Sequence, residues 1–335
     1  MKNNILPIDL ALFDGTAAVD PKVNTTGSTD LSVEMKTYYS DYLIDLAQPE
    51  LVHDQFAQKH PIPRDSGKVI EFRQFDPLPE LTTALAEGVT PDGQSLSAKG
   101  ITATVAQYGG YVTLSDLIQL TAIDNHILQA TKLCASQAGR TLDTITREVL
   151  AAGTNVQYSG GKTSRTTITA ADVLTVDDIK KAVRFLETQD APKLNGYYVG
   201  IIHPYTKYDL MKDPDWKYPH QYVDTENIYR NEIGELYGVR FVQSSRAKVF
   251  EKAGATPSGT GAVAADVYAT LILGDDAYGV TEIEGGGLQH IVKPLGSAGT
   301  ADPLNQRSTV GWKATKVAKL LVPQYMVRIE SGATA

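Results

Sequence analysis

The sequence has very little cysteine, since Cys134 stands alone among 335 residues. A lone cysteine cannot close an intramolecular disulfide or begin a zinc cluster, which excludes a disulfide-stapled secreted module and a zinc-finger protein. Long apolar runs are also absent, and none approaches the roughly 20 residues that a membrane-spanning helix requires. We therefore expect a chain that is made in a reducing compartment and has no membrane partner.

An excess of positive charge is absent too. The chain carries 31 Lys and Arg against 39 Asp and Glu, a formal net charge of -8. Because proteins that bind nucleic acid over a wide face need clustered basic residues to neutralise phosphates, we do not expect sequence-specific DNA binding. The shares of hydrophobic residues, 42%, and charged residues, 21%, are those of an ordinary globular protein, and the length predicts roughly two domains.

Spaced sets of catalytic or metal-ligating residues are missing as well. The six histidines show no HExxH spacing. His203 and His220 stand near several aspartates in the sequence, but a proline-bounded turn rich in polar residues accounts for them more simply. Residues 160–163 (GGKT) resemble the end of a phosphate-binding loop, yet Val156 occupies a position where that motif needs glycine. We predict no catalytic residue, no metal and no cofactor, and hence a protein that is not an enzyme.

A long helix and a long terminal strand are the clearest local signals. Between residues 124 and 152, apolar side chains recur at steps of three and four, which predicts a helix with one buried face. Residues 309–322 alternate between apolar and polar side chains, which predicts a half-buried strand that Pro323 ends. With the shorter strands and helices between them, these patterns indicate a mixed α+β chain.

Residues 76–100 separate two predicted strands, at 68–75 and 101–108. The segment holds several prolines and glycines, which disfavour regular structure, and a loop of this length in a compact domain is either functional or disordered. It also carries apolar side chains that a disordered linker would not need: Leu78, Leu81, Leu85, Val89 and Leu96. We interpret the loop as an extended flap whose apolar side is covered by another chain.

Residues 1–31 show no sustained period and are rich in turn-forming residues, which predicts an arm without a core of its own. From Ser32 to His60 the pattern becomes helical. Apolar side chains near the start of the arm are more stable in water when they are docked than when they are exposed. They are Ile5, Leu6, Ile8, Leu10 and Phe13. We predict that they fasten the arm to a second subunit.

Tyrosine is abundant, with 17 Tyr against 7 Phe and 2 Trp. Tyr is enriched at protein interfaces, because its ring packs while its hydroxyl finds a hydrogen-bond partner. The clusters at 38–42 and 197–237 are equally typical of a core margin, so they favour assembly only slightly.

Four segments carry a family resemblance. They are residues 143–147 (DTITR), 233–242 (IGELYGVRFV), 274–279 (GDDAYG) and 302–313 (DPLNQRSTVGWK). In these segments, which occur in the expected order between about residues 65 and 330, the chain resembles the major capsid protein family typified by the lytic phage N4. Residues 1–60 match that family only in character.

The resemblance implies the Hong Kong 97-type phage capsid fold, which is an α+β fold. Its implied layout is an N-terminal arm with leading helices at 1–66, an extended loop at 67–110, a peripheral domain at 111–174 and 301–335 with a spine helix at 124–152, and an axial domain at 175–300. The arm, the loop and the long helix that the residues predict independently fall where this layout expects them.

In function, the resemblance implies a major capsid protein of a tailed double-stranded DNA phage, made in the host cytoplasm and located in the virion. Its copies would self-assemble through pentamers and hexamers into an icosahedral head shell that encloses the DNA without sequence-specific binding. Scaffolding, portal and decoration proteins are further expected partners. Two alternatives stay open: an encapsulin-like nanocompartment shell around protein cargo, and a soluble enzyme of unknown chemistry.

Overall fold

The computed structural model describes residues 23–24, 52–63, 65, 67–75, 78–84, 87–88, 90, 93–121, 126–216, 234–256, 263–281, 283 and 288–334. In these residues the chain is a mixture of helices and strands, as the sequence predicts. It divides into two compact units. Unit 1 comprises residues 1–44, 110–135 and 290–312, and unit 2 comprises residues 45–109, 136–289 and 313–335.

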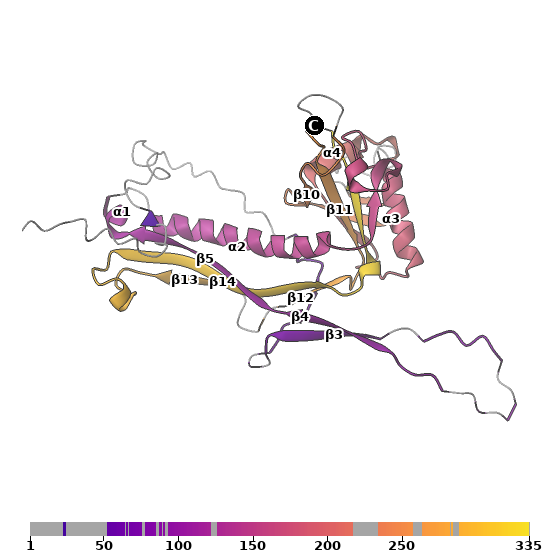
Figure 1. Cartoon of the computed structure of the whole chain (residues 1–335), viewed down its shortest axis with the longest axis horizontal. Helices are drawn as coiled ribbons and strands as arrows, with labels where there is room; N and C mark the ends of the chain where they lie inside the picture. The colour runs from indigo at the N-terminus through magenta and orange to yellow at the C-terminus, as the bar shows by residue number, and fades with distance from the viewer. Residues whose placement is uncertain are drawn as a thin grey trace, which may run out of the picture. The chain divides into compact units, whose positions relative to one another are not determined.

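The longest helix, α2, spans His126–Ala151 and confirms the helix predicted over 124–152 (Figure 1). Side chains at the predicted spacing are buried along it, among them Ala130, Cys134, Ala138 and Leu142. Cys134 therefore behaves as a small apolar residue, as its position on the apolar face predicts. None of the described helices is both long and apolar enough to cross a membrane.

Unit 2 contains a seven-stranded sheet with the strand order β6-β15-β11-β7-β9-β8, and β10 pairs with β11. Its strands are β6 (Val156–Tyr158), β7 (Tyr198–Ile202), β8 (Glu235–Leu236), β9 (Val239–Gln243), β10 (Val249–Phe250), β11 (Val267–Leu273) and β15 (Met326–Ser331). All residues of β7 and β15, and all but one of β11, are buried or nearly so. These three strands form the centre of the unit's core, which explains their continuous apolar character.

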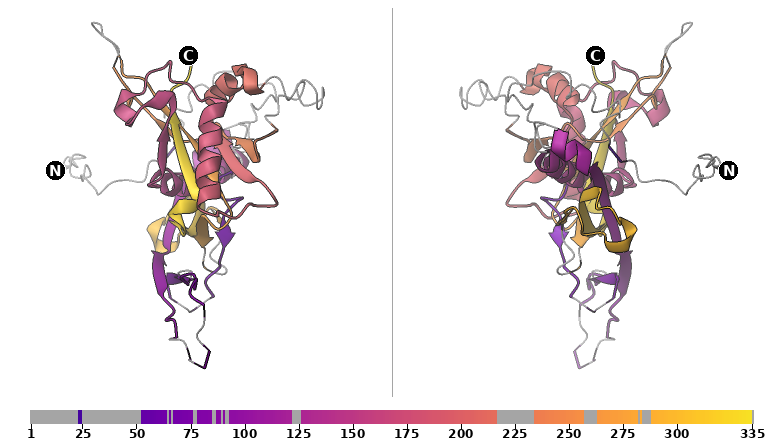
Figure 2. Two further views of the ribbon diagram at one scale, coloured as in Figure 1. Left: turned by 90° about the vertical axis from the view of Figure 1, so that its right-hand side faces the viewer. Right: turned by 90° about the vertical axis from the view of Figure 1, so that its left-hand side faces the viewer.

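Helix α3 (Val176–Thr188) covers one side of this sheet and lies along β15 (Figure 2, left). Its first turn is fixed by a capping box, in which the Thr175 hydroxyl accepts from the Asp178 N–H and the Asp178 carboxylate accepts from the Thr175 N–H. Helix α4 (Pro204–Lys212) starts at a proline, which needs no hydrogen-bond partner at that position.

A second sheet has the strand order β1-β5-β14-β12-β2, with β13 also on β14. Its strands are β1 (Val23–Asn24), β2 (Gln58–Lys59), β5 (Ala106–Ser115), β12 (Tyr278–Thr281), β13 (Gln289–Lys293) and β14 (Arg307–Leu320). The strand β14 confirms the long terminal strand predicted from alternation. A short helix, α1 (Asp116–Thr121), follows β5. Elements α2, β5, β13 and β14 contribute residues to both units, although all of β13 except Gln289 belongs to unit 1.

Strands β3 (Val69–Phe75) and β4 (Ala98–Thr104) form a separate antiparallel ribbon, paired from Val69↔Thr104 to Phe75↔Ala98. Figure 1 shows the two strands side by side. The described residues 78–84 and 93–97 continue beyond the paired strands without helix or strand. The predicted strand at 101–108 is wrong in its bounds, because Val105 separates β4 from β5. The Val105 N–H donates to the Lys68 carbonyl at 2.8 Å.

The predicted helix over 32–60 is wrong in its last part. Residues 52–57 form turns and Gln58–Lys59 form the short strand β2. Polar side chains of this segment bind distant elements, as described below, and these tertiary contacts override the local helical period. The rest of that prediction lies outside the described residues.

Candidate functional site

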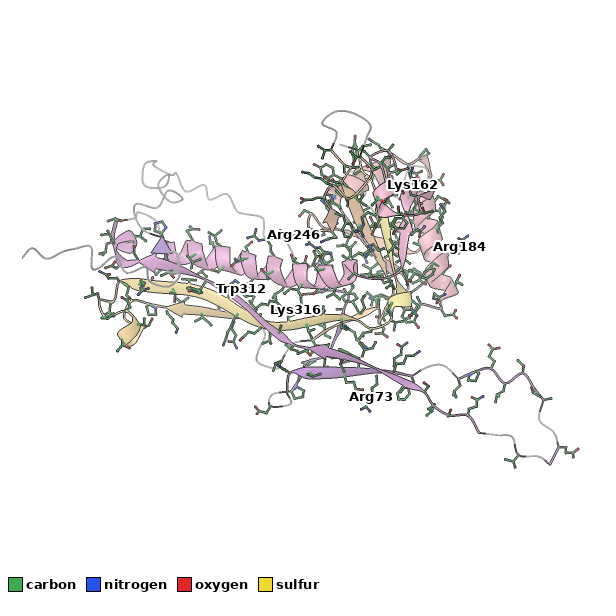
Figure 3. The ribbon with its side chains drawn as sticks, in the orientation of Figure 1. Arg73, Lys162, Arg184, Arg246, Trp312 and Lys316 are labelled. Carbon is green, nitrogen blue, oxygen red and sulfur yellow. The ribbon has the colours of Figure 1, made fainter. Side chains whose placement is uncertain are left out.

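The β3–β4 ribbon exposes an apolar surface. Exposed and half-buried residues alternate along β3, so that Val69 and Phe75 lie on the exposed face. Phe72, on the opposite face, contacts the ring of His60 edge-on at 5.6 Å between centroids. One face of the ribbon therefore contacts His60, whereas the other presents to solvent the apolar Val69 and Phe75 and the charged pair Glu71 and Arg73 (Figure 3 labels Arg73).

The loop beyond the ribbon extends this exposed surface. Of the predicted interface residues, Leu78 is 50% exposed, Leu81 is 79% exposed and Leu96 is 74% exposed. Burying one such leucine stabilises a complex by roughly 1.5–3 kcal/mol, so three exposed together favour a partner strongly. Two other predicted loop residues, Leu85 and Val89, lie outside the described residues. So do all the predicted arm residues: Ile5, Leu6, Ile8, Leu10 and Phe13.

Unit 1 carries further exposed apolar side chains, which no pattern in the sequence marks as exposed. Helix α1 exposes Leu117 and Leu120, and the segment before β14 exposes Leu304. The Asp116 N–H donates to the Gln306 carbonyl at 3.0 Å, which brings the two segments together. The helix α1 has only six residues, and so short a helix has little surface with which to pack its leucines against the rest of the subunit.

Strand β13 in the same unit is exposed along its whole length. Successive strand residues point to opposite faces, so the exposure of both Ile291 and Val292 leaves apolar side chains uncovered on both faces. With the α1 leucines, this strand makes unit 1 a second candidate contact surface.

The described tyrosines of the 197–237 cluster divide between core and surface, whereas the cluster at 38–42 lies outside the described residues. Tyr198 is buried in the core of unit 2, where its hydroxyl donates to the Ala191 carbonyl at 3.1 Å. Tyr205, Tyr208 and Tyr237 are exposed, and Tyr205 stacks on His203 at 5.4 Å. The exposed tyrosines are available for contacts with other molecules, whereas Tyr198 serves the subunit's own core.

A buried polar cluster in unit 2 holds the segment that leads into the ribbon. His53 and Asp143 are both buried, and Asp143 accepts from the His53 N–H at 2.9 Å while its other oxygen lies 2.9 Å from His53 Nδ1. Asp54 accepts from Lys316 and from Thr146 Oγ1. Because α2 and β14 supply these partners, the root of the ribbon is tied to both elements (Figure 3 labels Lys316).

The electrostatics of this cluster follow from its burial. Burial raises the pKa of Asp143, but the hydrogen bonds and charge of His53, with the charge of Lys316, outweigh it and lower the pKa below its ordinary value. Burial also raises the pKa of Tyr278, whose hydroxyl donates to the His53 carbonyl at 2.5 Å. Asp143 is thus held ionised and Tyr278 neutral, so both keep the protonation state that their hydrogen bonds to His53 require.

The residues considered for acid–base or metal chemistry have structural partners. His203 Nδ1 accepts from the Tyr205 N–H at 3.2 Å and caps α4. Asp209 accepts from the Thr334 N–H at 2.9 Å, and Asp213 accepts from the Val176 N–H at 3.0 Å. Across the described residues, no group of three His, Cys, Asp or Glu side chains could hold a metal ion. His220 lies outside the described residues.

Solved structures of phage capsids share this fold. The capsid structure of cyanophage P-SCSP1u matches with a TM-score of 0.68 at 15% sequence identity, covering 95% of this chain and 100% of that one. The capsid of Ralstonia phage GP4 and that of cyanophage Pam1 each match with a TM-score of 0.67 at 14% identity, covering 94% of this chain and 99% of theirs. At these identities the likeness shows a shared fold. No curated protein matches the sequence.

A sequence model of the family described as "Phage capsid protein" matches residues 35–294. The chain belongs to this family, and it is a structural protein, the major capsid protein of a phage head shell. The exposed apolar ribbon, loop and unit 1 surfaces have the character that such a shell subunit needs for contacts with its neighbours.

Proposed function

We propose that copies of this chain assemble through pentamers and hexamers into the icosahedral head of a tailed double-stranded DNA phage, with the Hong Kong 97-type fold and the N4-type set of motifs. The shell encloses the DNA without reading its sequence, after synthesis of the subunit in the host cytoplasm. Scaffolding, portal and decoration proteins are its proposed partners. In the proposed layout, residues 1–66 are the arm, 67–110 the extended loop, 111–174 and 301–335 the peripheral domain, and 175–300 the axial domain.

One observation carries the assembly mechanism: the described part of the loop keeps Leu78, Leu81 and Leu96 exposed. In a closed shell, a loop that reaches a neighbouring copy buries these leucines, and the same contact repeats around each ring because the interface is head-to-tail. Modest burial per contact becomes large when each copy is held by several neighbours. The apolar residues at 5–13 provide a second contact of the same kind.

The buried cluster supports the loop's role by fixing its root. Asp54 binds Lys316 on β14, and His53 binds Asp143 on α2, in the segment that leads to the first ribbon strand at Val69. A loop that must reach a defined place on a neighbour gains from such anchoring, because less freedom is lost on binding.

Negative-stain electron microscopy of the purified full chain, supported by light scattering, tests this proposal. Closed shells or regular rings of five and six support it, and their formation with co-expressed scaffolding protein counts equally. Shells that form only around protein cargo and never enclose DNA indicate the nanocompartment alternative. Monomers or small oligomers that persist with every co-expressed phage protein contradict the proposal.

A further inference from the structure

A hollow of about 660 Å³ lies in unit 2 where the turn between β9 and β10 meets α2. Most of its lining residues are charged or polar. They are Arg147, Ser245, Arg246, Ala247, Lys248, Val249, Phe250, Glu251 and Ala253. It thus differs in character from the apolar loop surface, which presents leucines.

The hollow's cationic side chains are held in place by the surrounding structure. Arg147 Nη1 donates to the Arg246 carbonyl at 2.9 Å, which fixes the turn against α2. Lys248 Nζ lies 2.7 Å from Glu148 Oε2. Burial raises the pKa of Glu148, but hydrogen bonds from Lys248 and Arg147 lower it below its ordinary value. The Glu148 carboxylate therefore interacts with both Arg147 and Lys248, and these three side chains together keep a net charge of one positive unit.

Arg246 is the exception, because its Nε is buried and has no hydrogen-bond partner among the residues that the structure describes. A guanidinium N–H that is removed from water without an acceptor costs roughly 1–3 kcal/mol. The Arg246 side chain lines the hollow, so a shift of the guanidinium toward an anion bound there would bring this N–H to an acceptor and relieve that cost (Figure 3 labels Arg246).

The sequence around the hollow is locally basic. Residues 239–252 contain Arg240, Arg246, Lys248 and Lys252 but only one acidic residue, Glu251, although the chain as a whole carries a net charge of -8. A local reversal of the chain's overall charge is what an anion-binding surface requires.

We propose that the hollow formed by Arg147, Arg246 and Lys248 binds phosphate groups of double-stranded DNA, irrespective of sequence, and lies on the inner face of the shell. The inference rests on the proposed function, since it needs DNA inside the shell. Phosphate oxygens are strong acceptors for guanidinium and ammonium groups. An acidic peptide is the competing anion, but the acidic segment at hand, residues 76–97, carries leucines that this mainly polar hollow does not accommodate.

The test measures binding of the full-length protein to two labelled 20-bp DNA duplexes of unrelated sequence, by fluorescence anisotropy at salt concentrations from 50 to 200 mM. The wild type should bind both duplexes equally, with affinity falling as salt rises. Each phosphate contact contributes about 0.9 to the slope of log affinity against log salt, so Arg246→Gln/Lys248→Gln should reduce that slope by about 2. Arg246→Lys/Lys248→Arg keeps both charges and should retain the slope.

Arg184→Gln is the matched control, because Arg184 is exposed on α3 and does not line the hollow (Figure 3). Its slope should equal that of the wild type. Equal slopes for the double-glutamine variant and the control would overturn the proposal, as would a wild type that binds neither duplex at 50 mM salt. If either of these results occurs while the wild type still forms shells in the electron microscope, the phosphate site is rejected and the proposed function stands. If the wild type forms no shells, the proposed function is rejected.

Discussion

The ring of His53 and the carboxylate of Asp143 form a buried pair, in which Nδ1 and Oδ2 are 2.9 Å apart although the two residues are 90 positions apart in sequence. The same aspartate accepts the His53 backbone N–H, so one side chain of α2 satisfies two donors of the segment that precedes the ribbon. The pair thus joins the root of the extended loop to the long helix.

Replacing Asp143 with alanine should destabilise the subunit. The change leaves the His53 backbone N–H and ring nitrogen buried without that partner, and we expect the free energy of unfolding to fall by about 2–3 kcal/mol. Urea denaturation of unassembled subunits measures this. Glu187→Ala, which breaks the exposed pair with Lys193, should stay within about 0.5 kcal/mol of the wild type. If the two changes lowered the free energy of unfolding equally, the buried His53–Asp143 pair would contribute no more to stability than an exposed ion pair.

The same aspartate should make stability depend on pH. Its pKa is lower in the folded protein than in the unfolded chain, so it contributes stability above about pH 4 that is lost as pH falls through its folded pKa. The wild type should therefore lose unfolding free energy faster than Asp143→Asn as pH drops from about 5 to about 3. A difference between the two proteins that stays constant over this range would contradict the assignment.

Two glycines should respond oppositely to alanine. A Cβ at Gly254 would lie 2.6 Å from the Ile168 carbonyl oxygen and 2.9 Å from that of Ala265, so we expect Gly254→Ala to cost about 1–3 kcal/mol. At Gly139, within α2, a Cβ would have no atom of the described residues within 4 Å. Gly139→Ala should stabilise the subunit by about 0.5–1 kcal/mol, because alanine favours helix. Thermal unfolding of both variants should give shifts of opposite sign.

Polar replacement of the loop leucines should separate folding from assembly. Since Leu78, Leu81 and Leu96 are exposed in the subunit, changing each to serine should alter its unfolding free energy by no more than about 0.5 kcal/mol per replacement. Particle formation, followed by light scattering and negative-stain microscopy, should fail. Val263→Ser serves as a control, because Val263 is exposed outside the loop. Normal shells from the triple variant would show that the loop leucines are dispensable.

Much of the local structure could be predicted because its cause is local. Helix α2 follows from apolar spacing, β14 from alternation, and the start of α3 from the Thr175–Asp178 capping box. In each case the chain's own period or cap decides the conformation, and distant residues only add packing. The exposed loop leucines could also be predicted, because apolar residues among prolines and glycines have no core nearby.

The rest depends on contacts between residues far apart in sequence. His53 and Asp54 lie in turns because partners on α2 and β14 hold them, and no local period reports those partners. The exposed strand β13 is equally hidden in the sequence, since its apolar residues are typical of a buried strand. Long-range polar pairing and incomplete covering of a strand must be seen in the fold.

The most direct test of the assembly mechanism is a cryo-electron microscopy reconstruction of the closed shell, in which the surroundings of Leu81 are examined. Our account predicts that this side chain, 79% exposed in the subunit, is buried against a neighbouring copy. A closed shell in which Leu81 and the other loop leucines still face solvent would contradict the central claim that the loop holds the shell together.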